Sequence, residues 1–126
     1  MESNLNLRAK EILTFVPSGP HYDLAIRFYQ EIGFQVDWKS DTEAILNKDG
    51  CRFFLQNLSH NWGKGNFMME LAVEDLDDWW DMLIGLDLEK YPEVKLKAPT
   101  DYPWGKREIH LIDPCNVLWH ISTKSK

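Results

Sequence analysis

The same order of secondary-structure signals occurs twice along this 126-residue chain. In each half, a short apolar run comes first, an amphipathic stretch with helical period follows, and three short strand-like runs complete the unit. The units cover about residues 10–58 and 66–122, and Val16 and Val73 occupy matching places. The repetition is one of pattern, because no repeat of the letters accompanies it. The sequence therefore predicts an α+β fold of two tandem βαβββ units.

Turn and capping residues set the predicted boundaries of these elements. The first unit reads as a strand at 11–19, a helix at 21–33, and strands at 34–38, 43–47 and 51–58. The second unit reads as a strand at 68–73, a helix capped by Asp75 and stopped at Gly85, and strands at 93–97, 107–112 and 117–122. Residues 1–9 are polar and aperiodic, which predicts an N-terminal arm ahead of a single domain at 10–126.

Composition and charge exclude several classes of function. The net charge is −6, with 14 basic and 20 acidic residues, and the basic residues are scattered, so we expect no nucleic-acid partner. No stretch approaches the roughly 20 apolar residues of a membrane span, so we expect no membrane partner. Cys51 and Cys115 lie far apart, in no metal-like or redox spacing, which indicates free thiols in a cytoplasmic protein. An acidic chain with six tryptophans suits a neutral or cationic small molecule.

Three ordered motifs resemble those of a known superfamily. They are RFYQEIGF in the first helix, VEDLDDWW at the start of the second, and PWGKREIHLIDPCNVLWHI near the end. Over about residues 10–122 the chain resembles the vicinal oxygen chelate superfamily, and most closely its glyoxalase/bleomycin-resistance group. The resemblance implies that each unit curls into a half-barrel, that the paired half-barrels enclose a cleft, and that the chain forms a homodimer.

Some members of this superfamily bind a divalent metal in the cleft, and this sequence carries only part of that ligand set. Counting from the DPCNV segment places His120 at a ligand position, and the same count on the first strand places Glu11 at another. Met68 falls where such members have a histidine. A shift of two residues would bring Glu70 into a ligand role, since the strand period keeps both side chains on one face. We therefore expect no cofactor, with a divalent metal ion held by Glu11, Glu70 and His120 as the alternative.

Glu70 interrupts an apolar strand, and a carboxylate buried there alone would be costly. It either lines a ligand pocket or pairs with Lys106 or Arg107 across the sheet. Trp104 lies in a turn fixed by Pro103 and Gly105, a common place for a binding residue. The residues predicted to bind ligand are Trp38, Phe54, Gln56, Trp62, Glu70, Trp104, Arg107 and His120.

No serine, cysteine or histidine stands in a recognisable nucleophile setting, so the sequence gives no sign of catalysis. The first hypothesis is therefore a binding protein of the bleomycin-resistance type, which sequesters an aromatic or cationic antibiotic-like compound in an acidic cleft edged by tryptophan. The alternative is a metal-dependent lyase, isomerase or thiol transferase of the glyoxalase superfamily.

Overall fold

The computed structural model describes residues 4–58 and 67–125. The first unit consists of β1 (Phe15–Pro17), the 3-10 turn η1 (Gly19–His21), α1 (Tyr22–Glu31), β2 (Gln35–Lys39), β3 (Glu43–Lys48) and β4 (Cys51–Gln56). The second consists of β5 (Met68–Ala72), α2 (Leu76–Gly85), η2 (Leu88–Lys90), β6 (Lys95–Tyr102), β7 (Lys106–Ile112) and β8 (Leu118–Lys124). The predicted pair of βαβββ units is confirmed.

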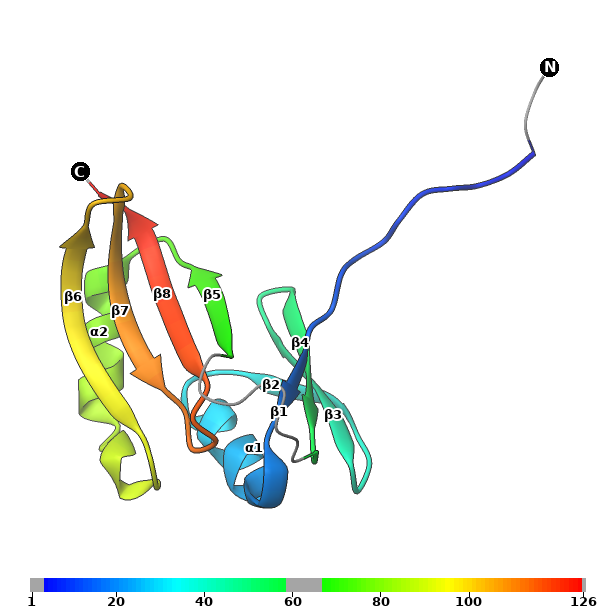
Figure 1. Cartoon of the computed structure of the whole chain (residues 1–126), viewed down its shortest axis with the longest axis horizontal. Helices are drawn as coiled ribbons and strands as arrows, with labels where there is room; N and C mark the ends of the chain where they lie inside the picture. The colour runs from blue at the N-terminus through cyan, green and yellow to red at the C-terminus, as the bar shows by residue number, and fades with distance from the viewer. Residues whose placement is uncertain (1–3, 59–66, 126) are drawn as a thin grey trace.

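Each unit forms its own four-stranded mixed sheet (Figure 1). Sheet A has the strand order β1-β4-β3-β2 and sheet B has the order β5-β8-β7-β6. In both sheets the first strand of the unit pairs in parallel with the last, and the other neighbours are antiparallel. The two sheets are therefore built by the same rule.

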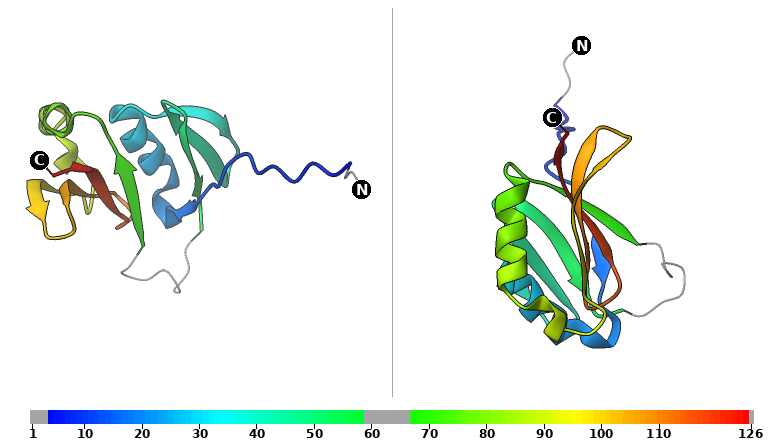
Figure 2. Two further views of the ribbon diagram at one scale, coloured as in Figure 1. Left: turned by 90° about the horizontal axis from the view of Figure 1, so that it is seen from above. Right: turned by 90° about the vertical axis from the view of Figure 1, so that its left-hand side faces the viewer.

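One helix covers one face of each sheet, and α1 lies between sheet A and β5 (Figure 2). Apolar side chains at alternate strand positions fill the space beneath the helices, as strand geometry requires. A cluster of aromatic rings joins the two units, in which Tyr29 of α1 packs against Phe53 of β4 and Trp119 of β8 at centroid distances of 5.2 and 5.8 Å. The core is consequently continuous across both units.

The turn between β7 and β8 is tied to this core by a buried carboxylate. Asp113 is 0% exposed, and its Oδ1 accepts hydrogen bonds from the backbone N–H groups of Cys115 and Val117. Its Oδ2 accepts a hydrogen bond of 2.5 Å from the Tyr29 hydroxyl, which in turn accepts one from Trp119 Nε1 at 2.8 Å. Burial raises the pKa of Asp113 despite these donors.

Two strands differ from their predicted extents by more than two residues at one end. β1 covers only Phe15–Pro17 instead of 11–19, because its parallel partner β4 pairs with three of its residues, and residues 4–14 extend away from the body (Figure 1). β6 continues to Tyr102 although Pro99 interrupts it. It is an edge strand with a register shift between Lys97 and Thr100, and both features accommodate a residue that lacks an N–H donor. No helix within the described residues has the length and apolar character needed to cross a membrane.

Candidate functional site

Sheet B has one face covered by α2 and one face free of helices, and alternate residues of β7 divide between them. Arg107 reaches Asp77 of α2 at 3.5 Å, while Ile109 and Leu111 are buried in the core. Lys106, Glu108 and His110 must therefore point to the opposite side, since successive strand residues alternate. We call this side the free face of sheet B; it faces the viewer in Figure 1, with α2 behind the sheet.

A row of stacked rings runs along this free face. Trp104, in the turn between β6 and β7, lies parallel to Tyr102 with centroids 4.6 Å apart. Tyr102 also stacks on His110 at 5.0 Å, and His110 meets His120 edge-on at 4.7 Å. Trp104 remains 60% exposed. The row therefore offers an accessible aromatic surface of the kind that flat ligands contact.

Glu108 holds this row in place. It is 3% exposed, and its Oε2 accepts a hydrogen bond of 2.9 Å from Trp104 Nε1. Its Oε1 lies 2.9 Å from His110 Nε2 and 2.8 Å from His120 Nδ1. Burial by itself would raise the pKa of Glu108, but hydrogen bonds from His120, Trp104 and His110 outweigh it and lower the pKa to about 2. Glu108 is thus a charged, fully partnered carboxylate that fixes three rings.

Glu70 lies on the same face, on β5 beside His120 of β8. It pairs with Lys106 and accepts a hydrogen bond of 2.7 Å from Ser122 Oγ. These two donors lower the pKa of Glu70. The glutamate inside the apolar strand is therefore half exposed and ion-paired, not buried without a partner. Of the two pairings predicted for it, the structure contains the one with Lys106.

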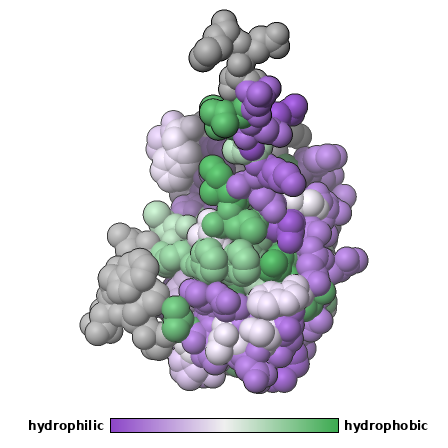
Figure 3. Space-filling model, turned by 90° about the vertical axis from the view of Figure 1, so that its right-hand side faces the viewer, coloured by the Kyte–Doolittle hydropathy of each residue, from purple (hydrophilic) through white to green (hydrophobic). Residues whose placement is uncertain are grey.

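Sheet A also has a face free of its helix, and the middle of that face is apolar (Figure 3). Trp38, Ile45, Phe54 and Phe15 follow one another across β2, β3, β4 and β1 by strand register. Phe15 stacks on Phe54 with centroids 4.3 Å apart, and both Phe15 and Trp38 are 47% exposed. Figure 3 shows hydrophobic side chains gathered in the middle of this side of the molecule. Gln56 continues the face and donates a hydrogen bond of 3.0 Å to Glu43.

The predicted ligand-binding residues thus fall into three groups. Glu70, Trp104 and His120 meet on the free face of sheet B, whereas Trp38, Phe54 and Gln56 lie on sheet A. Arg107 points to the helix side, where it pairs with Asp77 and with Asp101, so it does not line either free face. Trp62 lies outside the described residues.

The residues at the superfamily's metal positions do not fit a metal ion in this chain. Glu11 lies beside sheet A, where it accepts a hydrogen bond of 2.8 Å from Arg52, and Met68 offers no oxygen or nitrogen donor. Across residues 4–58 and 67–125, the one convergence of three ligating side chains is Glu108, His110 and His120. The alternative set of Glu11, Glu70 and His120 does not come together there.

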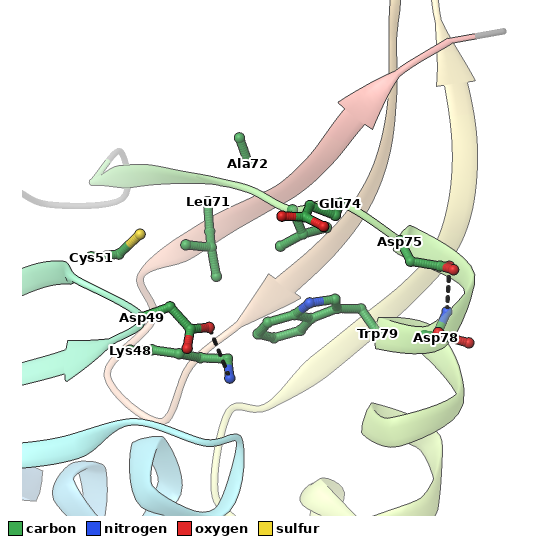
Figure 4. A pocket seen from close by; sticks show the side chains of 10 residues that line it. Lys48, Asp49, Cys51, Leu71, Ala72, Glu74, Asp75, Asp78 and Trp79 are labelled. Atoms are coloured by element: carbon green, nitrogen blue, oxygen red, sulfur yellow. Dashed lines mark hydrogen bonds and ion pairs between the residues drawn. The ribbon is translucent and has the colours of Figure 1, made fainter.

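A separate hollow of about 550 Å³ lies between the units, against the start of α2 (Figure 4). Trp79 and Lys48 form its floor, and Lys48 Nζ lies 5.4 Å from the centre of the Trp79 ring and 3.6 Å from Asp49. Asp75 caps α2 at the rim by accepting a hydrogen bond from the Asp78 N–H. Lys48 already contacts the Trp79 ring and pairs with Asp49, and the other acidic groups of the hollow do not by themselves define a site, so we place none there.

Glu108, His110 and Tyr102 are site residues that the sequence reading missed. His110 shares no short metal-binding spacing with another histidine in the sequence. The available signal was the two-residue spacing of Glu108 and His110 on one strand, which places both on one face. Their neighbour on β8 at that face, His120, was already a candidate.

Of the comparisons with known proteins, the one with solved structures finds matches. No family model matches the chain, and no curated protein matches it. A bleomycin resistance determinant encoded on transposon Tn5 superposes with a TM-score of 0.77 at 19% identity, over 93% of this chain and 100% of that one. The bleomycin-binding protein of bleomycin-producing Streptomyces verticillus, solved with copper(II)-bleomycin, superposes with a TM-score of 0.72 at 16% identity, over 94% of this chain and 100% of that one.

Enzymes share the same architecture. Lactoylglutathione lyase from Agrobacterium tumefaciens superposes with a TM-score of 0.68 at 14% identity, over 91% of this chain and 94% of that one. The fold is therefore the one that these bleomycin-resistance proteins and this lyase share, as the sequence motifs predicted. Within it, the architecture is the paired βαβββ arrangement of glyoxalases and bleomycin-resistance proteins.

Proposed function

We propose that the protein binds a small aromatic or cationic compound of the bleomycin type against the free face of sheet B. The observation that carries this proposal is the ring row that ends in Trp104, whose indole is 60% exposed and is held by Glu108. A ring fixed by a buried hydrogen bond loses little conformational freedom when a ligand stacks on it. The structural neighbours that bind bleomycin support the same class of ligand.

Glu70 supplies the negative charge for a cationic group in this proposal. Its present partner is Lys106, and their side chains are 47% and 36% exposed. An ion pair as exposed as this contributes only about 0 to 1 kcal/mol, so a ligand cation displaces Lys106 at little expense. Ser122 keeps the carboxylate oriented during the exchange.

Trp104→Ala is expected to weaken bleomycin binding about tenfold or more, because stacking and the buried area of one indole are worth at least about 1.4 kcal/mol. Glu70→Gln is expected to weaken it roughly 5- to 30-fold, or about 1 to 2 kcal/mol, through loss of a charge-assisted contact. Both are measured by titrating intrinsic tryptophan fluorescence with bleomycin. Trp79→Ala, on the far side of sheet B, is the matched control and should keep wild-type affinity. Wild-type affinity in both Trp104→Ala and Glu70→Gln would contradict the proposal.

The proposed assembly is a homodimer, because one chain does not close a cleft by itself. α1 lies between the sheets, so the apolar free face of sheet A points away from sheet B (Figure 2). A second copy can cover the exposed Phe15 and Trp38 and bring one sheet A opposite the other chain's sheet B. The extended segment adds further apolar groups that need cover, with Leu7 86% and Ile12 94% exposed.

Light scattering at micromolar concentration is expected to give twice the 14.8 kDa mass of one chain. Phe15→Glu should shift the mass toward the monomer, because it places a charge in the apolar face. Ile84→Glu, at a comparably exposed position on α2, should leave the dimer intact. A wild-type mass of one chain would remove the dimer from the proposal.

A further inference from the structure

Three side chains on the free face of sheet B converge as metal ligands do. One ligand atom from each of Glu108, His110 and His120 lies within 4.8 Å of the others. Glu108 and His110 are two residues apart on β7, and His110 pairs directly with His120 across the antiparallel ladder. Their positions are consequently fixed by two paired strands, and sites built on such elements are more precise than sites built on loops.

We propose that Glu108, His110 and His120 form a binding site for a divalent transition-metal ion such as Zn²⁺. Two imidazoles and one carboxylate are a donor set that zinc and its neighbours in the first transition row accept. Only His120 belongs to the ligand set that the superfamily resemblance implied. The other two ligands come from β7, so the proposed site lies within one sheet of one unit and does not depend on the small-molecule proposal.

Glu108, His110 and His120 each have a contact on the side that faces away from the proposed ion. Glu108 Oε2 is occupied by Trp104 Nε1, which leaves Oε1 directed at both histidines. For the inner ring nitrogens to offer lone pairs, each imidazole must carry its proton on the outer nitrogen. His110 Nδ1 lies 3.4 Å from the Tyr102 hydroxyl oxygen, and His120 Nε2 lies 3.4 Å from Met68 Sδ. If an ion displaces the inner N–H protons that now donate to Glu108, Met68 Sδ is a weak acceptor for the outer N–H of His120, and the stacked Tyr102 ring fixes the orientation of His110.

The two distances from Glu108 to the histidine nitrogens require only a small adjustment for an ion to enter. Glu108 Oε1 is now 2.9 and 2.8 Å from the two ring nitrogens, as in hydrogen bonds. A tetrahedral ion about 2.1 Å from each donor needs the donors about 3.4 Å apart, so they must separate by about half an ångström. The side chains of His110 and His120 are 21% and 22% exposed, which gives an ion access and leaves room for a solvent ligand.

Isothermal titration of the full-length, tag-free, EDTA-treated protein with Zn²⁺ tests the site. The expected result is one ion per chain, released again by EDTA, with affinity lowered at least about 10- to 100-fold in each of Glu108→Gln, His110→Ala and His120→Ala, since even outer-shell changes have effects of that size. Circular dichroism checks that each variant folds, and the two histidine variants keep the test decisive if Glu108→Gln does not fold.

The matched controls are Glu43→Gln, a carboxylate on sheet A, and His21→Ala, an exposed histidine at the start of α1. Both should bind Zn²⁺ as the wild type does. The inference is overturned if the wild type binds no Zn²⁺. The cluster would then be only a structural hydrogen-bond network around Glu108. It is equally overturned if binding survives in His110→Ala and His120→Ala, or is lost in Glu43→Gln or His21→Ala.

Discussion

Replacing Asp113 by alanine is expected to lower the free energy of unfolding by about 3 to 5 kcal/mol, enough to unfold much of a domain of ordinary stability. Asp113 is fully buried and accepts hydrogen bonds from Tyr29 and from two backbone N–H groups. Its removal leaves three buried or partly buried donors without acceptors. Each unsatisfied donor costs about 1 to 3 kcal/mol of stability, and the three costs do not simply add.

Urea denaturation followed by circular dichroism measures this loss. Asp101→Ala is the control, because Asp101 is an exposed carboxylate in the same unit, and its side chain is 65% exposed in an ion pair with Arg107. That control should change the free energy of unfolding by less than about 1 kcal/mol. A similarly small change in Asp113→Ala would mean that the hydrogen bonds to Asp113 do not hold the β7–β8 turn to α1.

Two neighbouring phenylalanines on β4 give the second large expected effect. Phe53 is 2% exposed and packs edge-to-face on Tyr29, Phe34 and Trp119, so Phe53→Ala is expected to cost about 3 to 5 kcal/mol of stability. Phe54 points to the opposite, solvent-accessible side and stacks on Phe15. Phe54→Ala should therefore change the stability of the monomer by only about 1 kcal/mol.

The same urea series separates the two positions, and light scattering adds a second measurement. Phe54→Ala is expected to weaken self-association while leaving the unfolding free energy of the monomer nearly unchanged. Equal losses of stability in both variants would contradict the assignment of β4 to one buried and one free face.

The order of the elements was predictable because local signals agree with the fold. Asp75 caps α2 as predicted, and the two units follow the predicted pattern of strands and helix. The ends of β1 and β6 were not predictable, because they depend on partners. β1 pairs with β4 only at Phe15–Pro17, although β4 begins at Cys51, and β6 passes Pro99 only because it is an edge strand.

The candidate site was predictable only in part, because the residues of a strand do not by themselves determine which side chains point to which face of the sheet. Lys106 and Arg107 read alike in sequence, yet only Lys106 reaches Glu70, while Arg107 reaches α2. Glu108 is one polar position of an alternating strand. Its role depends on Trp104 and His120, and only the paired strands and the turn bring them to it.

The central proposal is that the free face of sheet B binds a bleomycin-type compound, and titration of ¹⁵N-labelled protein with bleomycin followed by NMR tests it most directly. We expect saturable chemical-shift changes of the Trp104 indole N–H, the His120 ring and the backbone of Glu70. The signals of Trp79 and Ile84, which lie on α2, should change little. Absence of any saturable shift at millimolar bleomycin, or shifts confined to α2, would contradict it.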